Sequence, residues 1–303
     1  MLLSAVGYSI LMISFTKLPR QRYDPNALDG FESGRDFALG TGKALMWLSQ
    51  LAYETDEPDK IIDVLQSWGL QLVVDGIIIE DVGTALPVAS TRCFVATGRG
   101  ATLIAFAGTD PLVLANWITD FDAHIDRTQT ARGYQVATDA VWQRLRSVIS
   151  KTAPITNKVF VAGHSLGGVL AALTALNIDG DCLADVVAVY TFGMPRPGSK
   201  LFADRQYNPR LGSRTYRLVH GNDLVATLAP SWLGFHHVGR YLRCERGSKF
   251  DPAKLTAESS WDESQFISAM AQEFQDVFQD PIAVFSAQLT RLKDAAKALA
   301  FGA

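Results

Sequence analysis

Ser165, flanked by glycines in the stretch 163–168 (Gly-His-Ser-Leu-Gly-Gly), is the side chain of this sequence best placed for chemistry. The run before it, residues 158–162, is apolar and β-branched, and residues 169–176 after it are helix formers. A serine in a Gly-x-Ser-x-Gly turn between a strand and a helix presents its hydroxyl as a nucleophile. The stretch therefore predicts acyl transfer, most simply ester hydrolysis.

A nucleophilic serine also needs N–H donors that stabilise the negative oxygen of the tetrahedral intermediate. Thr109 follows a predicted strand at 102–107, where an α/β-hydrolase supplies the first such donor. The backbone N–H of Leu166, directly after the serine, supplies the second. Thr109 and Leu166 are therefore the predicted oxyanion hole.

The acid that orients the base is predicted to be Asp223, which follows a predicted strand at 214–219. It comes after the serine in chain order, as the triad acid of an α/β-hydrolase does. Asp179, Asp181 and Asp185 also come after the serine, but they lie close to the end of its helix. We expect these three to serve a solvated turn.

The base must be a histidine, and the chain has five: His124, His164, His220, His236 and His237. His164 would point away from the nucleophile that it precedes, and His124 comes before the serine, in the wrong order. His237 is the best local candidate, since the chain after Asp223 could fold back toward it.

Strands and helices alternate around the serine. Predicted helices lie at 45–52, 59–68, 136–148 and 169–176, and predicted strands at 70–79, 92–97, 102–107, 158–162, 184–192 and 214–219. Residues 98–100 suit a hairpin connection. Alternation of this kind predicts an α/β fold with a mainly parallel central sheet, the α/β-hydrolase fold, with flanking helices.

Six segments make the chain resemble the class 3 lipases, the α/β-hydrolases that include the fungal triacylglycerol lipases. The segments are Phe106-Ala107-Gly108-Thr109, Asn116-Trp117-x-x-Asp120, 163–168, Thr191-Phe192-Gly193-Met194-Pro195-Arg196-Pro197-Gly198, Asn222-Asp223-Leu224-Val225 and Gly234-Phe235-His236-His237-Val238-Gly239. They occur in order over roughly residues 40–245. The resemblance implies Ser165 as nucleophile, Asp223 as triad acid and Thr109 as oxyanion residue, and Ala107 departs from the arginine that the family often has there.

The resemblance also implies a lid at 110–118. This segment begins with Asp110 and includes the apolar Leu112, Leu114 and Trp117. An apolar run directly after the oxyanion residue could cover the acyl site in water and open at a lipid surface. A core loop fixed against the sheet is the alternative.

For the base, the resemblance points elsewhere. The family's triad histidine lies near the C-terminus in a segment like Asp-His-x-x-Tyr, whereas His237 matches a structural histidine of the family. No histidine follows His237 in this chain. Two readings stay open: the base is absent from this chain, or His237 performs its role.

The composition of the chain limits the kinds of partner and cofactor that we expect. The formal net charge of −3 and the absence of a long basic run argue against nucleic acid. The three cysteines suit neither a disulfide framework nor a zinc site, and the chemistry calls for no metal or organic cofactor. The expected partner is a lipid ester at a lipid–water interface, with peripheral membrane contact and a secreted or membrane-peripheral location.

The two ends of the chain differ from its middle. Residues 1–15 are apolar but short for a span of about 20 residues, so we expect 1–35 to be a lead-in packed on the core, a membrane-interface anchor or a degenerate secretion signal. Residues 36–250 form the hydrolase domain. Residues 251–303 contain two predicted amphipathic helices separated by Pro281, packed on the same domain or facing a partner or a membrane surface.

The sequence thus predicts a lipase that acts through a serine acyl-enzyme. Two other classes remain: a catalytically silent interaction protein without the histidine, and a serine thioesterase or peptidase on the same fold.

Overall fold

The computed structural model describes residues 17–82, 90–108, 125, 128–221, 223, 225–227, 234–245 and 248–256. Several predicted features lie outside these residues. They are the apolar segment 1–15, Thr109, the lid at 110–118, His124 and the two C-terminal helices at 266–299.

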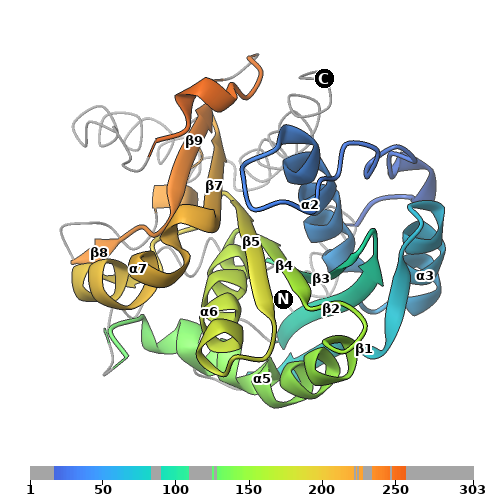
Figure 1. Cartoon of the computed structure of the whole chain (residues 1–303), viewed down its shortest axis with the longest axis horizontal. Helices are drawn as coiled ribbons and strands as arrows, with labels where there is room; N and C mark the ends of the chain where they lie inside the picture. The colour runs from blue at the N-terminus through green and yellow to red at the C-terminus, as the bar shows by residue number, and fades with distance from the viewer. Residues whose placement is uncertain are drawn as a thin grey trace, which may run out of the picture.

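A seven-stranded sheet crosses the protein in the order β1-β2-β3-β4-β5-β7-β9 (Figure 1). Its strands are β1 (Gln71–Asp81), β2 (Ser90–Gly98), β3 (Ala101–Phe106), β4 (Lys158–His164), β5 (Asp185–Phe192), β7 (Thr215–His220) and β9 (Arg240–Cys244). The pairs β1–β2 and β2–β3 are antiparallel, and the pairs from β3 to β9 are parallel. The predicted mainly parallel sheet is confirmed, with the hairpin at 98–100 joining β2 to β3.

Helices cover both faces of the sheet (Figure 1). One face packs against α2 (Leu39–Leu51) and α3 (Pro58–Ser67), and the other against α5 (Arg132–Thr152) and α6 (Leu166–Gly180). Strand β4 shows why two cores form: Val159 and Val161 belong to the cluster with α5 and α6, and Phe160 and Ala162 to the cluster with α2. Successive side chains of a strand point to opposite faces, so an apolar strand fills two layers.

Helix α6 carries Leu, Val and Ala on every side, and all of its first ten residues are buried. A helix that is apolar all round needs neighbours on all sides. Here β3, β4 and β5 lie beneath it and α5 beside it. The residue that precedes α6, Ser165, therefore has a rigid support.

Short elements complete the described part of the protein. The strands β6 (Gly198–Ser199) and β8 (Phe235–His236) pair with each other. The helices are the π-helix η4 (Phe202–Tyr207), α7 (Asn208–Leu211) and the 3₁₀ helices η1 (Arg20–Arg22), η2 (Ala52–Glu54), η5 (Gly212–Arg214), η6 (Val225–Thr227) and η8 (Pro252–Lys254). They are too short to leave a periodic pattern in the sequence, and none of them was predicted. No helix in the described ranges has the length and apolar character needed to cross a membrane.

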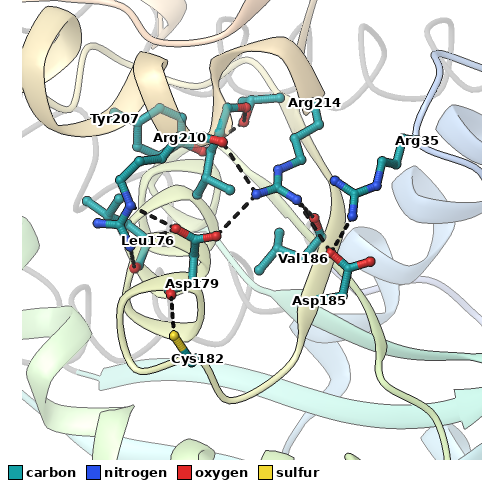
Figure 2. A network of polar contacts seen from close by, with 11 residues as sticks. Arg35, Leu176, Asp179, Cys182, Asp185, Val186, Tyr207, Arg210 and Arg214 are labelled. Carbon is teal, nitrogen blue, oxygen red and sulfur yellow. Dashed lines mark hydrogen bonds and ion pairs between the residues drawn. The ribbon is translucent and has the colours of Figure 1, made fainter.

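Ion pairs fix the C-terminal end of α6 (Figure 2). The Asp179 carboxylate accepts hydrogen bonds from Arg210 at 2.8 Å and from Arg214 at 3.1 Å. Asp185, at the start of β5, accepts one from Arg35 at 2.7 Å. Helix α6 has 15 residues, so this network lies about 20 Å from Ser165. Asp179 and Asp185 are thus partly buried members of ion pairs, which is more than the solvated turn that was expected of them.

Candidate active site

Four neighbouring parallel strands bring the candidate residues to one edge of the sheet. Strand β3 ends just before Gly108, β4 leads into Ser165, β5 ends just before Gly193 and β7 ends shortly before Asp223. The carboxyl ends of parallel strands meet at the same edge, where open α/β sheets bind their ligands. The structure therefore places Ser165 and Asp223 on the same rim although 58 positions separate them in sequence.

The backbone at Ser165 has the strained geometry of a nucleophile turn. Its φ is 55° and its ψ is −130°, values that a residue with a side chain rarely adopts. The Ser165 N–H donates to the Phe192 carbonyl at 2.9 Å, which holds the turn against β5. The side chain is 1% exposed, and its Oγ has no hydrogen-bond partner within the described residues. Its hydroxyl is thus left without a structural role there.

Two glycines are required by the close packing of this turn. A Cβ at Gly163 would collide with the Gly167 carbonyl oxygen, and a Cβ at Gly167 would lie 2.5 Å from the Ala107 carbonyl oxygen. Real side chains do not approach so closely. The glycines on both sides of the serine therefore bring the start of α6 against the end of β3.

The oxyanion side of the site is described in part. Leu166 is the first residue of α6, so its N–H has no carbonyl partner within the helix. A Cβ at Gly108 would collide with the Tyr53 hydroxyl and would lie 3.1 Å from the Ser165 Cβ. The chain that leads to Thr109 therefore passes beside the serine. Thr109 itself is outside the described residues.

Asp223 is half-buried and held by its own loop. One carboxylate oxygen accepts a hydrogen bond from the Val225 N–H at 3.0 Å. The other lies against Gly193, where a Cβ would collide with it. The same point is 3.8 Å from His164 Nε2, so this nitrogen and the carboxylate both lie near Gly193.

The His164 ring also contacts Tyr53, the middle residue of η2, directly after α2. The Tyr53 hydroxyl lies 2.8 Å from His164 Nδ1. Burial lowers the pKa of His164 from 6.5 to about 4, so the ring is neutral at neutral pH. Sequence reasoning gave neither residue a role, because 111 positions separate them and no local pattern links them.

His237, the candidate base, lies between β8 and β9 in a positively charged environment. Burial and the charges of Arg217 and Arg196 hold its pKa well below 6.5. Its Nδ1 is buried and has no hydrogen-bond partner in the described part of the chain. Arg217 is itself 3% exposed and stacks on the Tyr241 ring at 4.6 Å, and burial lowers its pKa to about 9. These surroundings disfavour a proton on His237.

The remaining histidines occupy other positions. His220 is the last residue of β7, and His236 lies on β8. Among the described residues, no three acidic, cysteine or histidine side chains come together as metal ligands.

Comparison with known proteins identifies the matching segment. Residues 103–232 match the sequence profile of the family Lipase (class 3). Over 152 residues the chain is 31% identical to "Secreted mono- and diacylglycerol lipase 1" of Fusarium solani, an alignment that covers 48% of this chain and 44% of that protein. The chain thus spans less than half the length of this relative.

Solved structures share the fold. A lipase from Rhizopus microsporus var. chinensis superposes with a TM-score of 0.56 at 19% identity, covering 73% of this chain and 80% of that one. The Rhizomucor miehei lipase in complex with its propeptide gives a TM-score of 0.54 at 24% identity, covering 70% of this chain and 69% of that one. The α/β-hydrolase fold predicted from the sequence is confirmed.

Proposed function

The chain is a member of the class 3 lipase family over residues 103–232, and from this premise we propose that it hydrolyses carboxylic esters of acylglycerols through an acyl-enzyme on Ser165. The observation that carries the proposal is the strained Ser165 turn, whose buried hydroxyl is engaged by no described residue. The name of the Fusarium solani relative, a mono- and diacylglycerol lipase, supports acylglycerols as the substrate class.

In the first half of the reaction, Ser165 Oγ attacks the ester carbonyl carbon while a histidine base takes the hydroxyl proton. The tetrahedral intermediate collapses, the C–O bond to the alcohol breaks, and the alcohol leaves with the proton from the base. Water then attacks the acyl-enzyme by the same steps and releases the fatty acid. Asp223 orients the base and stabilises its positive charge.

The negative oxygen of the intermediate is stabilised by N–H groups at the edge of the sheet. The Leu166 N–H is available because it begins α6, and the dipole of this helix adds positive potential at the same end. Thr109 is proposed as the second donor because Gly108 passes beside Ser165. Removing one such donor typically costs about 10²–10³ in kcat.

For the base, we favour its absence from this sequence over a role for His237. A general base must accept a proton near the working pH, and two arginines oppose a proton on His237. His237→Gln should therefore lower stability but retain most of the turnover of the full-length protein. A loss of about 10⁶ in kcat, the size expected for a triad histidine, would assign the base to His237.

A lid at 110–118 is part of the proposal, including Asp110, Leu112, Leu114 and Trp117. Hiding each large apolar side chain from water is worth about 1.5–3 kcal/mol, a gain that disappears at a lipid surface. The rate should then rise sharply when the substrate exceeds its solubility limit, and Trp117→Ala should reduce that rise. A smooth saturation curve, unchanged by Trp117→Ala, would mean that these residues do not gate the site.

We further propose a secreted or membrane-peripheral protein that meets its substrate at an interface. The word "secreted" in the name of the Fusarium solani relative supports this. A protein recovered only in the soluble interior of cells, with no turnover of emulsified lipid, would contradict it.

The test of the activity compares one acyl chain in several linkages. Dioleoylglycerol, trioleoylglycerol, an oleoyl thioester and an oleoyl anilide are offered to the wild type and to Ser165→Ala, in the full-length protein. We expect turnover of the glycerides that is lost in Ser165→Ala while the variant stays folded. Preference for the thioester or anilide would instead indicate a thioesterase or peptidase, and no turnover at all an interaction protein.

A further inference from the structure

Tyr53 and His164 join three parts of the site that lie far apart in sequence. The Tyr53 hydroxyl touches the Gly108 backbone on one side and the His164 ring, at 2.8 Å, on the other. On the other edge of the ring, Nε2 lies near Gly193, and an oxygen of the Asp223 carboxylate lies against the same glycine. A continuous path of side chains therefore runs from the oxyanion segment, beneath the nucleophile, to the acid.

The chemistry of the partners determines which nitrogen of His164 carries the proton. A neutral imidazole has one N–H donor and one acceptor nitrogen. A carboxylate only accepts, so the N–H is more stable on Nε2, the nitrogen that shares the vicinity of Gly193 with Asp223. Nδ1 is then the acceptor, and the Tyr53 hydroxyl donates to it. The tyrosine proton thus keeps the histidine N–H directed at the acid.

We propose that Tyr53 and His164 are positioning residues that hold the Asp223 carboxylate in the orientation needed by the base. In this role both residues act through Asp223 rather than on the substrate. His164 turns an N–H edge toward the carboxylate, and Tyr53 fixes the tautomer that makes this possible while supporting Gly108 on the oxyanion side. The inference rests on the proposed ester hydrolysis, since it assigns a means of positioning for the acid of that reaction.

The first test removes only the hydroxyl. Tyr53→Phe should lower kcat by about 10–100-fold, the loss typical when a group that orients an active residue is removed. KM should change little, because no substrate contact is lost. The matched control is Tyr216→Phe, whose hydroxyl donates to the Arg35 carbonyl at 2.6 Å away from the rim, and it should retain full kcat.

The second test uses the shape of two amides. A glutamine at position 164 can place its amide N–H near the position of Nε2, whereas an asparagine reaches only as far as Nδ1. His164→Gln should therefore retain more kcat than His164→Asn. In the His164→Gln background, Tyr53→Phe should lower kcat by a smaller factor than in the wild type, because no tautomer remains to be selected and only the support of Gly108 is lost.

A spectroscopic test does not depend on turnover. The ¹⁵N chemical shifts of the His164 ring, assigned by their loss in His164→Gln, should show a protonated Nε2 and an unprotonated Nδ1 that shifts in Tyr53→Phe. An Nδ1–H tautomer, or an active Tyr53→Phe with unchanged kcat, would overturn this inference alone. Absence of turnover in the wild type, with the Nε2–H tautomer present, would overturn the proposed function and the positioning role that rests on it.

Discussion

The two ends of helix α6 are built in opposite ways. At its beginning, Ser165 has a positive φ, glycines that allow no side chain, and a buried hydroxyl that no described residue engages. At its end, the Asp179 carboxylate is shared by Arg210 and Arg214. A carboxylate near the negative end of a helix dipole is unfavourable, and the two guanidinium groups offset this.

Within one helix, the residues that serve reactivity therefore lie at the beginning, and the residues that serve stability lie at the end. Strain and unengaged polar atoms cost free energy, and they persist where the surrounding structure fixes them. The packed body of α6 and the ion pairs at its end supply that fixation. Substitutions at the beginning should therefore reduce activity, and substitutions at the end should reduce stability alone.

The largest effect is expected for the acid on the reactive rim. Asp223→Asn should lower kcat by about 10⁴, because an amide no longer selects the right tautomer of the base. The melting temperature should change little. Turnover on the emulsified glyceride measures this, and a loss of less than tenfold would mean that another carboxylate orients the base.

The second effect concerns the glycine before the serine. Gly163→Ala should destabilise the protein by about 1–3 kcal/mol and also lower turnover, because the new methyl group must displace the Gly167 carbonyl and with it the start of α6. Urea unfolding and the glyceride assay report the two losses. The matched control is Gly34→Ala, where a Cβ has nothing within 4 Å, and equal losses in both variants would exclude the steric explanation.

At the other end of α6, Asp179→Asn should destabilise the protein by about 2 kcal/mol while kcat stays unchanged, because it weakens charged hydrogen bonds to two arginines. Asp204→Asn is the control, since Asp204 is exposed and pairs with the exposed Lys200 one helical turn away, and it should not measurably change the stability. A reduced kcat in a folded Asp179→Asn variant would contradict the claim that the end of α6 affects stability alone.

The smallest effect is a pH dependence of stability from His164. Its pKa is about 4 in the folded state and 6.5 when unperturbed, so between these values the unfolded chain binds more protons. Stability should therefore fall as the pH drops from 6.5 toward 4. His237, whose pKa is also lowered, adds to the same fall. His164→Gln should make this fall of stability with pH shallower. An unchanged slope would show that His164 is not held neutral. His236→Gln serves as the control.

The sequence predicted those parts of the site that depend on local pattern. The Ser165 turn needs particular residues within six positions, and the strands around it are apolar runs buried on both faces, so both could be read directly. Asp223 could be predicted because chain order is fixed in this fold.

Other parts depend on contacts that no local pattern contains. The Tyr53–His164 contact spans 111 positions and exists only because α2 packs on β4. The weak basicity of His237 comes first from its burial and then from Arg217 and Arg196, which lie on separate segments. Sequence reasoning could place His237 near Asp223 in the chain, but it could not show the charges around the ring.

The most direct test of the central claim is covalent labelling of the nucleophile. The full-length protein is treated with a fluorophosphonate, its intact mass is measured, and the modified peptide is mapped. We expect a single adduct on Ser165, slower labelling in Asp223→Asn, and none in Ser165→Ala. An adduct on another residue, or one that persists in Ser165→Ala, would contradict Ser165 as the nucleophile.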